Sequence, residues 1–161
     1  MNNNTQKTDN KTVAIETLKS YCAYQERCIS DVKLYAIKKQ IPQNITESAI
    51  LILIDSDYLN ENRFAQSFTR GKFSQNKWGK VKIKYELLKK GISETLITKA
   101  LEEINDEEYN QLIEKLIIQK INKDENLQTQ ISKIIQYLIS KGFEYELVKS
   151  IITEIQKQNK K

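Results

Sequence analysis

The sequence predicts an all-α protein built from three tandem three-helix repeats that form an elongated, curved array. Composition gives the first two observations. Glycine and proline are scarce, with four and one among 161 residues, although a sheet protein needs many turns that use these residues. Leu, Ile, Lys, Glu and Gln are abundant instead, and they favour or tolerate helix.

A repeat of 51 residues is the third observation, and it sets the register of the helices. Gln40, Gly91 and Gly142 align at this spacing, each near the middle of a similar segment. Because the spacing of apolar residues within each copy is helical, the units are helical too. The aligned positions are Val32/Ile83/Ile134, Ala36/Leu87/Leu138, Ile37/Leu88/Ile139, Ile45/Leu96/Leu147 and Ile50/Leu101/Ile152.

A unit of 51 residues has room for three ordinary helices with short turns. Such units would bury their apolar faces locally and on their neighbours, leaving a broad concave surface. We expect a disordered polar tail over 1–12, repeats over 13–57, 58–105 and 106–158, and a frayed end at 159–161. The nine expected helices span 13–26, 29–40, 43–56, 60–75, 78–90, 93–104, 106–123, 126–141 and 144–158.

Local signals support several of these limits. Pro42 suits the first turn of the third helix. The segment from Lys77 alternates apolar and charged residues like a strand, but its partner in the next repeat does not, so we interpret it as helix. Asn76 or Ser74 is a candidate cap at its start. Gly91 can adopt the left-handed conformation that ends it, and Ser93 can cap the helix that follows.

Composition also excludes several classes of function. The chain has no histidine, which removes Ser-His-Asp and Cys-His catalysis. Cys22 and Cys28 match no CxxC pattern and cannot fill a zinc site alone, so we expect reduced thiols in a cytoplasmic protein. No glycine-rich phosphate loop, no secretory signal and no run long enough to span a membrane occurs. We therefore expect no catalytic residue, no metal and no cofactor.

A strongly basic segment is the main candidate site. From Arg63 to Lys90 the chain has nine basic residues against Glu86 alone: Arg63, Arg70, Lys72, Lys77, Lys80, Lys82, Lys84, Lys89 and Lys90. On a helical projection, Lys82, Tyr85 and Lys89 fall within about 40° of Trp78 and roughly opposite the apolar face. A basic surface with aromatic residues fits phosphate contacts with base stacking, or an acidic partner. Taken alone, Trp78 is more typical of helix packing.

Two further clusters have a structural interpretation. Tyr21 and Tyr24, with Gln25, Glu26 and Arg27, form either a site or a helix end, and we favour packing. An acidic cluster is placed where a helix ends and the next begins, so we interpret it as a solvated cap that the helix dipole favours. Its members are Glu102, Glu103, Asp106, Glu107 and Glu108.

Four stretches resemble the RecX family of regulators of the RecA recombinase. They are YCAYQER (21–27), YLNENRFAQSFTRGKF (58–73), KWGKVKIKYELLKKGI (77–92) and ALEEINDEEY (100–109). The resemblance covers Ile15 to Gln119, and the third unit matches in pattern. Its most specific part combines the Asn60–Ala65 core with Trp78-Gly79-Lys80 and Lys90-Gly91-Ile92. The first unit departs from the family pattern at Lys33-Leu34 and Ala36-Ile37.

The resemblance implies three tandem three-helix repeats and a non-enzymatic protein that acts in DNA repair and the SOS response. It implies binding to RecA in the groove of the RecA–DNA filament, inhibition of the RecA ATPase and strand exchange, and direct binding to DNA. We expect the protein to be a monomer. The alternative is a stand-alone helical DNA-binding module that uses the same surface. Candidate contact residues are the nine basic residues above together with Trp78, Tyr85 and Arg27.

Overall fold

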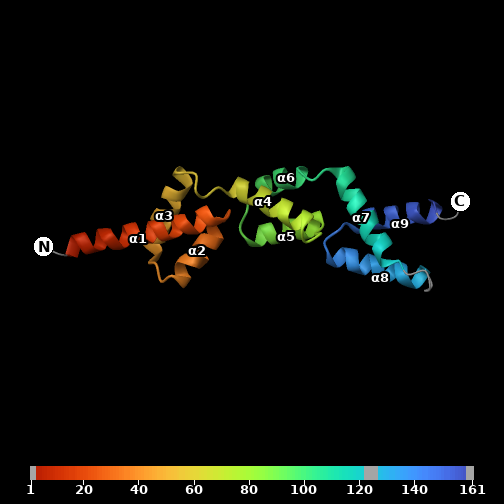
Figure 1. Cartoon of the computed structure of the whole chain (residues 1–161), viewed down its shortest axis with the longest axis horizontal. Coiled ribbons are helices and arrows are strands. Elements are labelled where there is room, and N and C mark those ends of the chain that lie inside the picture. The colour runs from red at the N-terminus through yellow and green to blue at the C-terminus, as the bar shows by residue number, and fades with distance from the viewer. Residues whose placement is uncertain (1–2, 122–126, 159–161) are drawn as a thin grey trace.

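The structure, a computed structural model, describes residues 3–121 and 127–158. All regular structure in these two ranges is helical, and the helices form an elongated row (Figure 1). This confirms the expected all-α class. None of the described helices has the length and apolar character that a membrane crossing needs. The bounds are Asn3–Tyr24 for α1, Ile29–Lys38 for α2, Gln43–Asp55 for α3, Glu61–Ser74 for α4, Lys80–Lys89 for α5, Glu94–Glu102 for α6, Asp106–Lys120 for α7, Leu127–Ser140 for α8 and Tyr145–Gln158 for α9.

Six of these helices, α2 to α6 and α9, begin and end within two residues of the limits that the sequence predicts, as do the start of α7 and the end of α8. The exception is α1, which begins at Asn3, so residues 3–12 are helical where we expected a disordered tail. The segment contains no glycine or proline, and a helix that is already nucleated extends with one hydrogen bond for each added residue. Residues 1–2, the expected frayed end at 159–161 and the expected helix limits at 123 and 126 lie outside the described residues.

The start of α5 also differs from the expectation. Gly79, in extended conformation, is its N-cap, and Trp78 lies in the preceding turn. Neither proposed cap acts there, because Ser74 is the last residue of α4 and Asn76 lies in the turn. The cap at Ser93 is confirmed, since its hydroxyl accepts a hydrogen bond from the Leu96 amide at 3.5 Å.

The three aligned positions that set the register share one backbone conformation. Gln40, Gly91 and Gly142 have φ of 56°, 81° and 88°, and each lies just after the middle helix of its repeat. This left-handed conformation ends a helix and turns the chain. The agreement confirms the 51-residue register at the level of the backbone.

Burial follows the same register, with one departure. Val32, Ile83 and Ile134 are buried, as are Ala36, Leu87 and Leu138. The next aligned set is exposed in every repeat, with Ile37 at 71%, Leu88 at 41% and Ile139 at 41%. Core packing therefore explains the first two sets and leaves the third without a packing reason.

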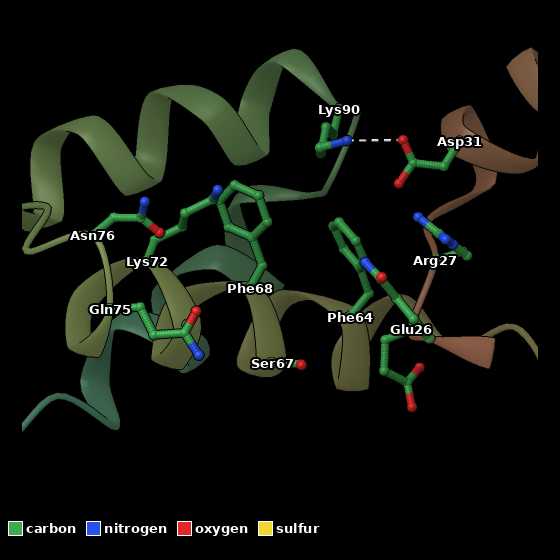
Figure 2. Close-up of a pocket in the computed structure, with 12 residues that line it drawn as sticks. Glu26, Arg27, Asp31, Phe64, Ser67, Phe68, Lys72, Gln75, Asn76 and Lys90 are labelled. Carbon is green, nitrogen blue, oxygen red and sulfur yellow. Dashed lines mark hydrogen bonds and ion pairs between the residues drawn. The ribbon is translucent and has the colours of Figure 1, made fainter. Parts of the chain in front are cut away.

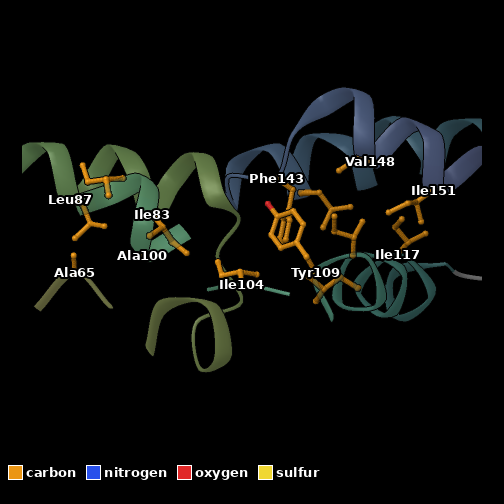
Figure 3. Packing of buried hydrophobic residues seen from close by; sticks show 14 of the residues in the cluster. Ala65, Ile83, Leu87, Ala100, Ile104, Tyr109, Ile117, Phe143, Val148 and Ile151 are labelled. Atoms are coloured by element: carbon orange, nitrogen blue, oxygen red, sulfur yellow. The ribbon is translucent and has the colours of Figure 1, made fainter. Parts of the chain in front are cut away.

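The buried residues form two cores. One lies within the first repeat, where Leu18 of α1 packs with residues of α2 and α3. The second and third repeats share the other, in which Ile83 and Leu87 of α5 continue to Tyr109 of α7 and Phe143 (Figure 3). The first repeat contributes buried Cys28 to this shared core. Repeats two and three are therefore one packing unit, and the first repeat is a second.

Backbone hydrogen bonds join the second and third repeats in addition to their shared core. The Gly79 amide donates to the Lys141 carbonyl at 2.9 Å, and the Val81 amide donates to the Gly142 carbonyl at 3.1 Å. A Cβ on Gly79 would lie 2.1 Å from the Gly142 carbonyl oxygen, so only glycine allows this approach. The Tyr109 hydroxyl accepts a hydrogen bond from the Lys80 amide at 2.9 Å and donates one at 2.7 Å to the carboxylate of Glu144, the residue before α9.

Polar side chains tie the first repeat to the second. Arg63 Nε lies 2.9 Å from Glu26, and Lys90 Nζ lies 2.8 Å from Asp31. The Ser30 hydroxyl donates to the Lys90 carbonyl at 2.8 Å. This joint depends on charge and hydrogen bonds, with two buried apolar residues beside them: Cys28 lies in the core of the second and third repeats, and Leu59 lies in the core of the first.

Candidate functional site

Four lysines gather around the turn between α4 and α5. The ammonium groups of Lys72 and Lys82 lie 4.8 and 4.6 Å from the ring centroid of Trp78. Lys77 donates to the Ser74 carbonyl, and Lys141 of the third repeat donates to the Asn76 carbonyl at 3.4 Å. Among the described residues, no carboxylate lies within 4.0 Å of these four ammonium groups. We call Lys72, Lys77, Trp78, Lys82 and Lys141 the lysine–tryptophan cluster.

The other six basic residues of the predicted segment have acidic partners. Their positive charge is partly compensated, so they contribute less to an anion-binding surface than the sequence count suggests. The pairs are Arg63 with Glu26 (2.9 Å) and Asp57 (2.7 Å), Arg70 with Glu103 (3.2 Å), Lys80 with Asp106 (2.8 Å), Lys84 with Glu94 (3.9 Å), Lys89 with Glu86 (3.7 Å) and Lys90 with Asp31 (2.8 Å).

The stripe expected from the helical projection is only partly present. Lys82 lies against Trp78, as expected, but Lys89 lies over Tyr85, with its ammonium group 5.4 Å from that ring centroid. The projection failed because Trp78 precedes the helix and does not follow its 100° step. Lys84, Tyr85 and Lys89 are exposed residues of α5.

A groove of about 440 Å³ runs from this cluster to the first repeat. Figure 2 shows Lys72, Gln75 and Asn76 at one end, and Arg27, Asp31 and Lys90 at the other. Phe64 and Phe68 of α4 lie between the two ends. The groove therefore continues the basic surface across the joint between repeats one and two.

Arg27 and Lys72 supply the uncompensated charge of the groove. The Arg27 guanidinium lies 4.1 Å from the Tyr21 ring centroid, and its buried Nε has no hydrogen-bond partner in the described structure. Lys90 is neutralised by Asp31. Burial raises the pKa of Asp31, but hydrogen bonds from Lys90 and Cys28 outweigh it, so the pKa lies below its ordinary value. The arrangement suits an anion placed near Arg27.

The tyrosines near Arg27 have opposite environments. Tyr21 packs as expected, since its ring stacks on Tyr35 at 3.9 Å with an angle of 4° between planes. The packing interpretation is wrong for Tyr24, which is 84% exposed, because it is the last residue of α1 and no described residue covers it.

The acidic cluster forms a helix cap, as we expected. The Asn105 side chain accepts hydrogen bonds from the amides of Glu107 and Glu108 at 2.9 and 3.1 Å. Asp106, Glu107 and Glu108 occupy the first turn of α7, whereas Glu102 and Glu103 lie at the end of α6. Glu103 and Asp106 additionally bind Arg70 and Lys80. Both carboxylates therefore have partners within the chain.

Sequence reasoning missed Lys141, the one member of the cluster from the third repeat. A signal existed, because Lys39, Lys90 and Lys141 each precede an aligned left-handed residue. The polar residues at one end of the groove, Gln75 and Asn76, had no such signal. They line the same groove as Arg27 only because α4 packs beside the first repeat.

The comparisons with known proteins agree with this architecture. The family model of the second three-helix domain of RecX matches residues 60–101, and that of the third matches 106–152. The chain belongs to the RecX family. The Regulatory protein RecX of Oceanobacillus iheyensis is 30% identical over 138 residues, covering 84% of this chain and 50% of its own. That of Lactobacillus gasseri is 32% identical over 148 residues, covering 88% and 53%.

The chain spans about half the length of these curated RecX relatives. Solved structures match it over most of its length. RecX from Lactobacillus salivarius has a TM-score of 0.82 at 26% identity, covering 92% of this chain and 98% of the solved one. A second regulatory protein RecX has a TM-score of 0.83 at 23% identity, covering 92% and 75%, and supports the fold alone.

Proposed function

We propose that this chain binds the RecA recombinase or its DNA filament and inhibits its ATPase and strand-exchange activities, thereby modulating repair and recombination. Membership of the RecX family, whose matched relatives are named regulatory proteins, is the observation that carries the proposal. The chain acts by binding and hydrolyses no nucleotide itself. Its place of action is the cytoplasm, where the RecA filament forms.

The lysine–tryptophan cluster supplies the contact to the DNA of the filament. Its four ammonium groups lack carboxylate partners among the described residues, so they are available to phosphates. Lys72 and Lys82 both lie within 5 Å of the Trp78 ring centroid, and the partly exposed indole adds an aromatic surface for stacking or cation–π contact. The groove extends the same chemistry to Arg27, which gives a strand a longer path to follow.

An ATPase titration at fixed DNA tests the activity. RecA turnover is expected to fall as the chain is added, while the chain without RecA hydrolyses no ATP. Unchanged RecA turnover at saturating chain contradicts the proposal and leaves the DNA-binding alternative.

Charge reversal tests the cluster. Lys72→Glu with Lys82→Glu is expected to weaken inhibition about tenfold or more, because each phosphate contact contributes through counterion release. The matched control is Lys99→Glu with Lys115→Glu, which makes the same change of charge at exposed positions of α6 and α7. The wild type should also lose inhibition as salt rises, and the cluster variant should show a smaller slope. Equal losses in both variants would assign the effect to net charge.

The alternative function is a stand-alone DNA-binding module, which the same cluster favours. A pull-down with RecA in the presence and absence of DNA separates the two. Capture of RecA without DNA supports the regulator. Capture of RecA only when DNA is present supports the module, provided that an unrelated DNA-coating protein is captured in the same way.

A further inference from the structure

Two helices present the same chemistry to solvent at the same four positions. On α2 these are Lys33, Leu34, Ile37 and Lys38, and 51 residues later on α5 they are Lys84, Tyr85, Leu88 and Lys89. All eight are exposed, and the four apolar side chains are 65%, 71%, 59% and 41% accessible for Leu34, Ile37, Tyr85 and Leu88. We call these eight residues the α2–α5 stripe.

Packing does not account for the stripe. Buried positions must repeat because each repeat needs the same core, but exposed positions are free to vary. The third repeat shows that these exposed positions can vary. Its middle helix, α8, has Ile135, Gln136 and Ser140 at three of the four positions. Only Ile139 keeps the exposed aliphatic residue. A single exposed apolar side chain is ordinary, whereas a matched set on two helices indicates an interaction surface.

The charge around the stripe indicates the chemistry of the partner. Lys33, Lys38, Lys84 and Lys89 flank the apolar residues. Within the part of the chain that the structure describes, only the last two have a carboxylate within 4.0 Å, at 3.9 and 3.7 Å. The complementary surface is apolar with carboxylates at its edge. Nucleic acid supplies the negative charge but presents only scattered apolar groups, such as the thymine methyl, so two exposed apolar patches flanked by lysines fit a protein surface better.

The repetition indicates how the partner is arranged. α2 and α5 lie along the same long side of the row of helices (Figure 1). Two equivalent contact points on one chain are used together when the partner also repeats its site, as a helical polymer of identical subunits does. Simultaneous engagement of both points raises affinity without any new contact type.

We propose that the α2–α5 stripe is a protein-docking surface with two equivalent contact points, and that its partner is a polymer of identical subunits with an acidic, apolar site on each. The proposal rests on the proposed function, in which that polymer is the RecA filament. In this proposal the two surfaces have different ligands: the α2–α5 stripe binds protein, and the lysine–tryptophan cluster binds DNA. The positions of Lys84 and Lys89 in α5 correspond to Ile135 and Ser140 in α8, which carry no charge. Docking is therefore confined to the first two repeats.

Three matched variants, together with the combination of the first two, test this assignment. Leu34→Ser with Ile37→Ser removes the α2 point, Tyr85→Ser with Leu88→Ser removes the α5 point, and Ile139→Ser is the control at the aligned position of α8. Each is compared by titration of RecA filaments, titration of naked DNA and melting temperature. Because all five side chains are exposed, the melting temperature should hardly change.

Loss of either point is expected to weaken filament binding about tenfold or more, because two-point binding becomes one-point binding. Loss of both should leave only the affinity measured on naked DNA, and Ile139→Ser should bind as the wild type does. Stripe variants that bind filaments at full strength overturn the proposal, as does an equal loss on naked DNA. A dimeric wild type that the stripe variants convert to monomer assigns the face to a second copy and also overturns it. Failure of the wild type to bind filaments defeats the proposed function itself.

Discussion

At the residue scale, Asp31 and Lys90 form the best-protected ion pair between the first two repeats, with side chains 18% and 31% exposed. Lys90 is desolvated, which lowers its pKa, but the bond to Asp31 outweighs this and raises it. The pKa of Asp31 lies below its ordinary value for the reciprocal reason. The pair therefore stays fully charged across the neutral range, and its contribution to stability does not change there.

The sign of each shift fixes the pH dependence of stability. The contribution of Asp31 is present above its unfolded pKa of about 3.9 and is lost as pH falls through the lower folded pKa. That of Lys90 is full below about 10.4 and is lost as pH rises through the higher folded pKa. Since the chain has no histidine, we expect the free energy of unfolding to be nearly flat from about pH 5 to 8.

Asp31→Asn tests this pair. The substitution leaves Lys90 without its carboxylate, so we expect a loss of about 1–3 kcal/mol at neutral pH and a shallower acid limb. Urea denaturation from about pH 3 to 8 measures both. Glu16→Gln, which disrupts only an exposed pair within α1, serves as the control and should change stability little. An acid limb identical to that of the wild type would contradict the assignment.

At the element scale, two glycines with the same backbone conformation have different surroundings. Gly91 and Gly142 have φ of 81° and 88°, and both end the middle helix of a repeat. A Cβ on Gly91 would meet nothing within 4 Å, whereas one on Gly142 would lie 2.2 Å from the Cβ of Lys82. The second glycine is therefore required by the joint between repeats as well as by the turn.

The pair gives a matched prediction. Gly91→Ala should cost about 1–2 kcal/mol from left-handed strain alone. Gly142→Ala should cost a further 1–3 kcal/mol or so, because α5 must move away from the third repeat. Denaturant unfolding measures the difference, and equal losses for the two variants would contradict the close approach.

Much of this element-level structure was predictable from local signals. Aligned Gln40, Gly91 and Gly142 gave the helix ends, and apolar spacing gave the helices between them. Two features were not predictable in this way. The start of α5 depends on Gly79 pairing with the distant Lys141 carbonyl, and the start of α1 on extension of a helix packed elsewhere. Contacts between repeats join residues that are distant in the sequence, so local sequence signals do not reveal them.

At the scale of the whole molecule, the same limit applies to the site. A count of charges located the basic segment, but it did not show which charges the fold neutralises. The partners of Arg63 and Lys90 come from the first repeat, and those of Arg70 and Lys80 come from beyond α5. The surface that remains free of carboxylates is defined by tertiary structure, and it includes Lys141 from another repeat.

The two cores predict two cooperative units. Repeats two and three share apolar residues from Ile83 to Phe143 and are joined by backbone hydrogen bonds, so neither can open without exposing the other. The first repeat has its own core around Leu18 and is tied to the second mainly by ion pairs, which contribute less than buried apolar surface.

Native-state hydrogen exchange measures the free energy of each opening. Protected amides of α4 to α9 within the described residues should share one free energy of opening, and those of α2 and α3 should exchange through a smaller one. Asp31→Asn should lower the smaller value and leave the larger one nearly unchanged, because it weakens the joint without touching the shared core. A single free energy for amides of α2, α5 and α8 would mean that the buried Cys28 contact is enough to couple all three repeats.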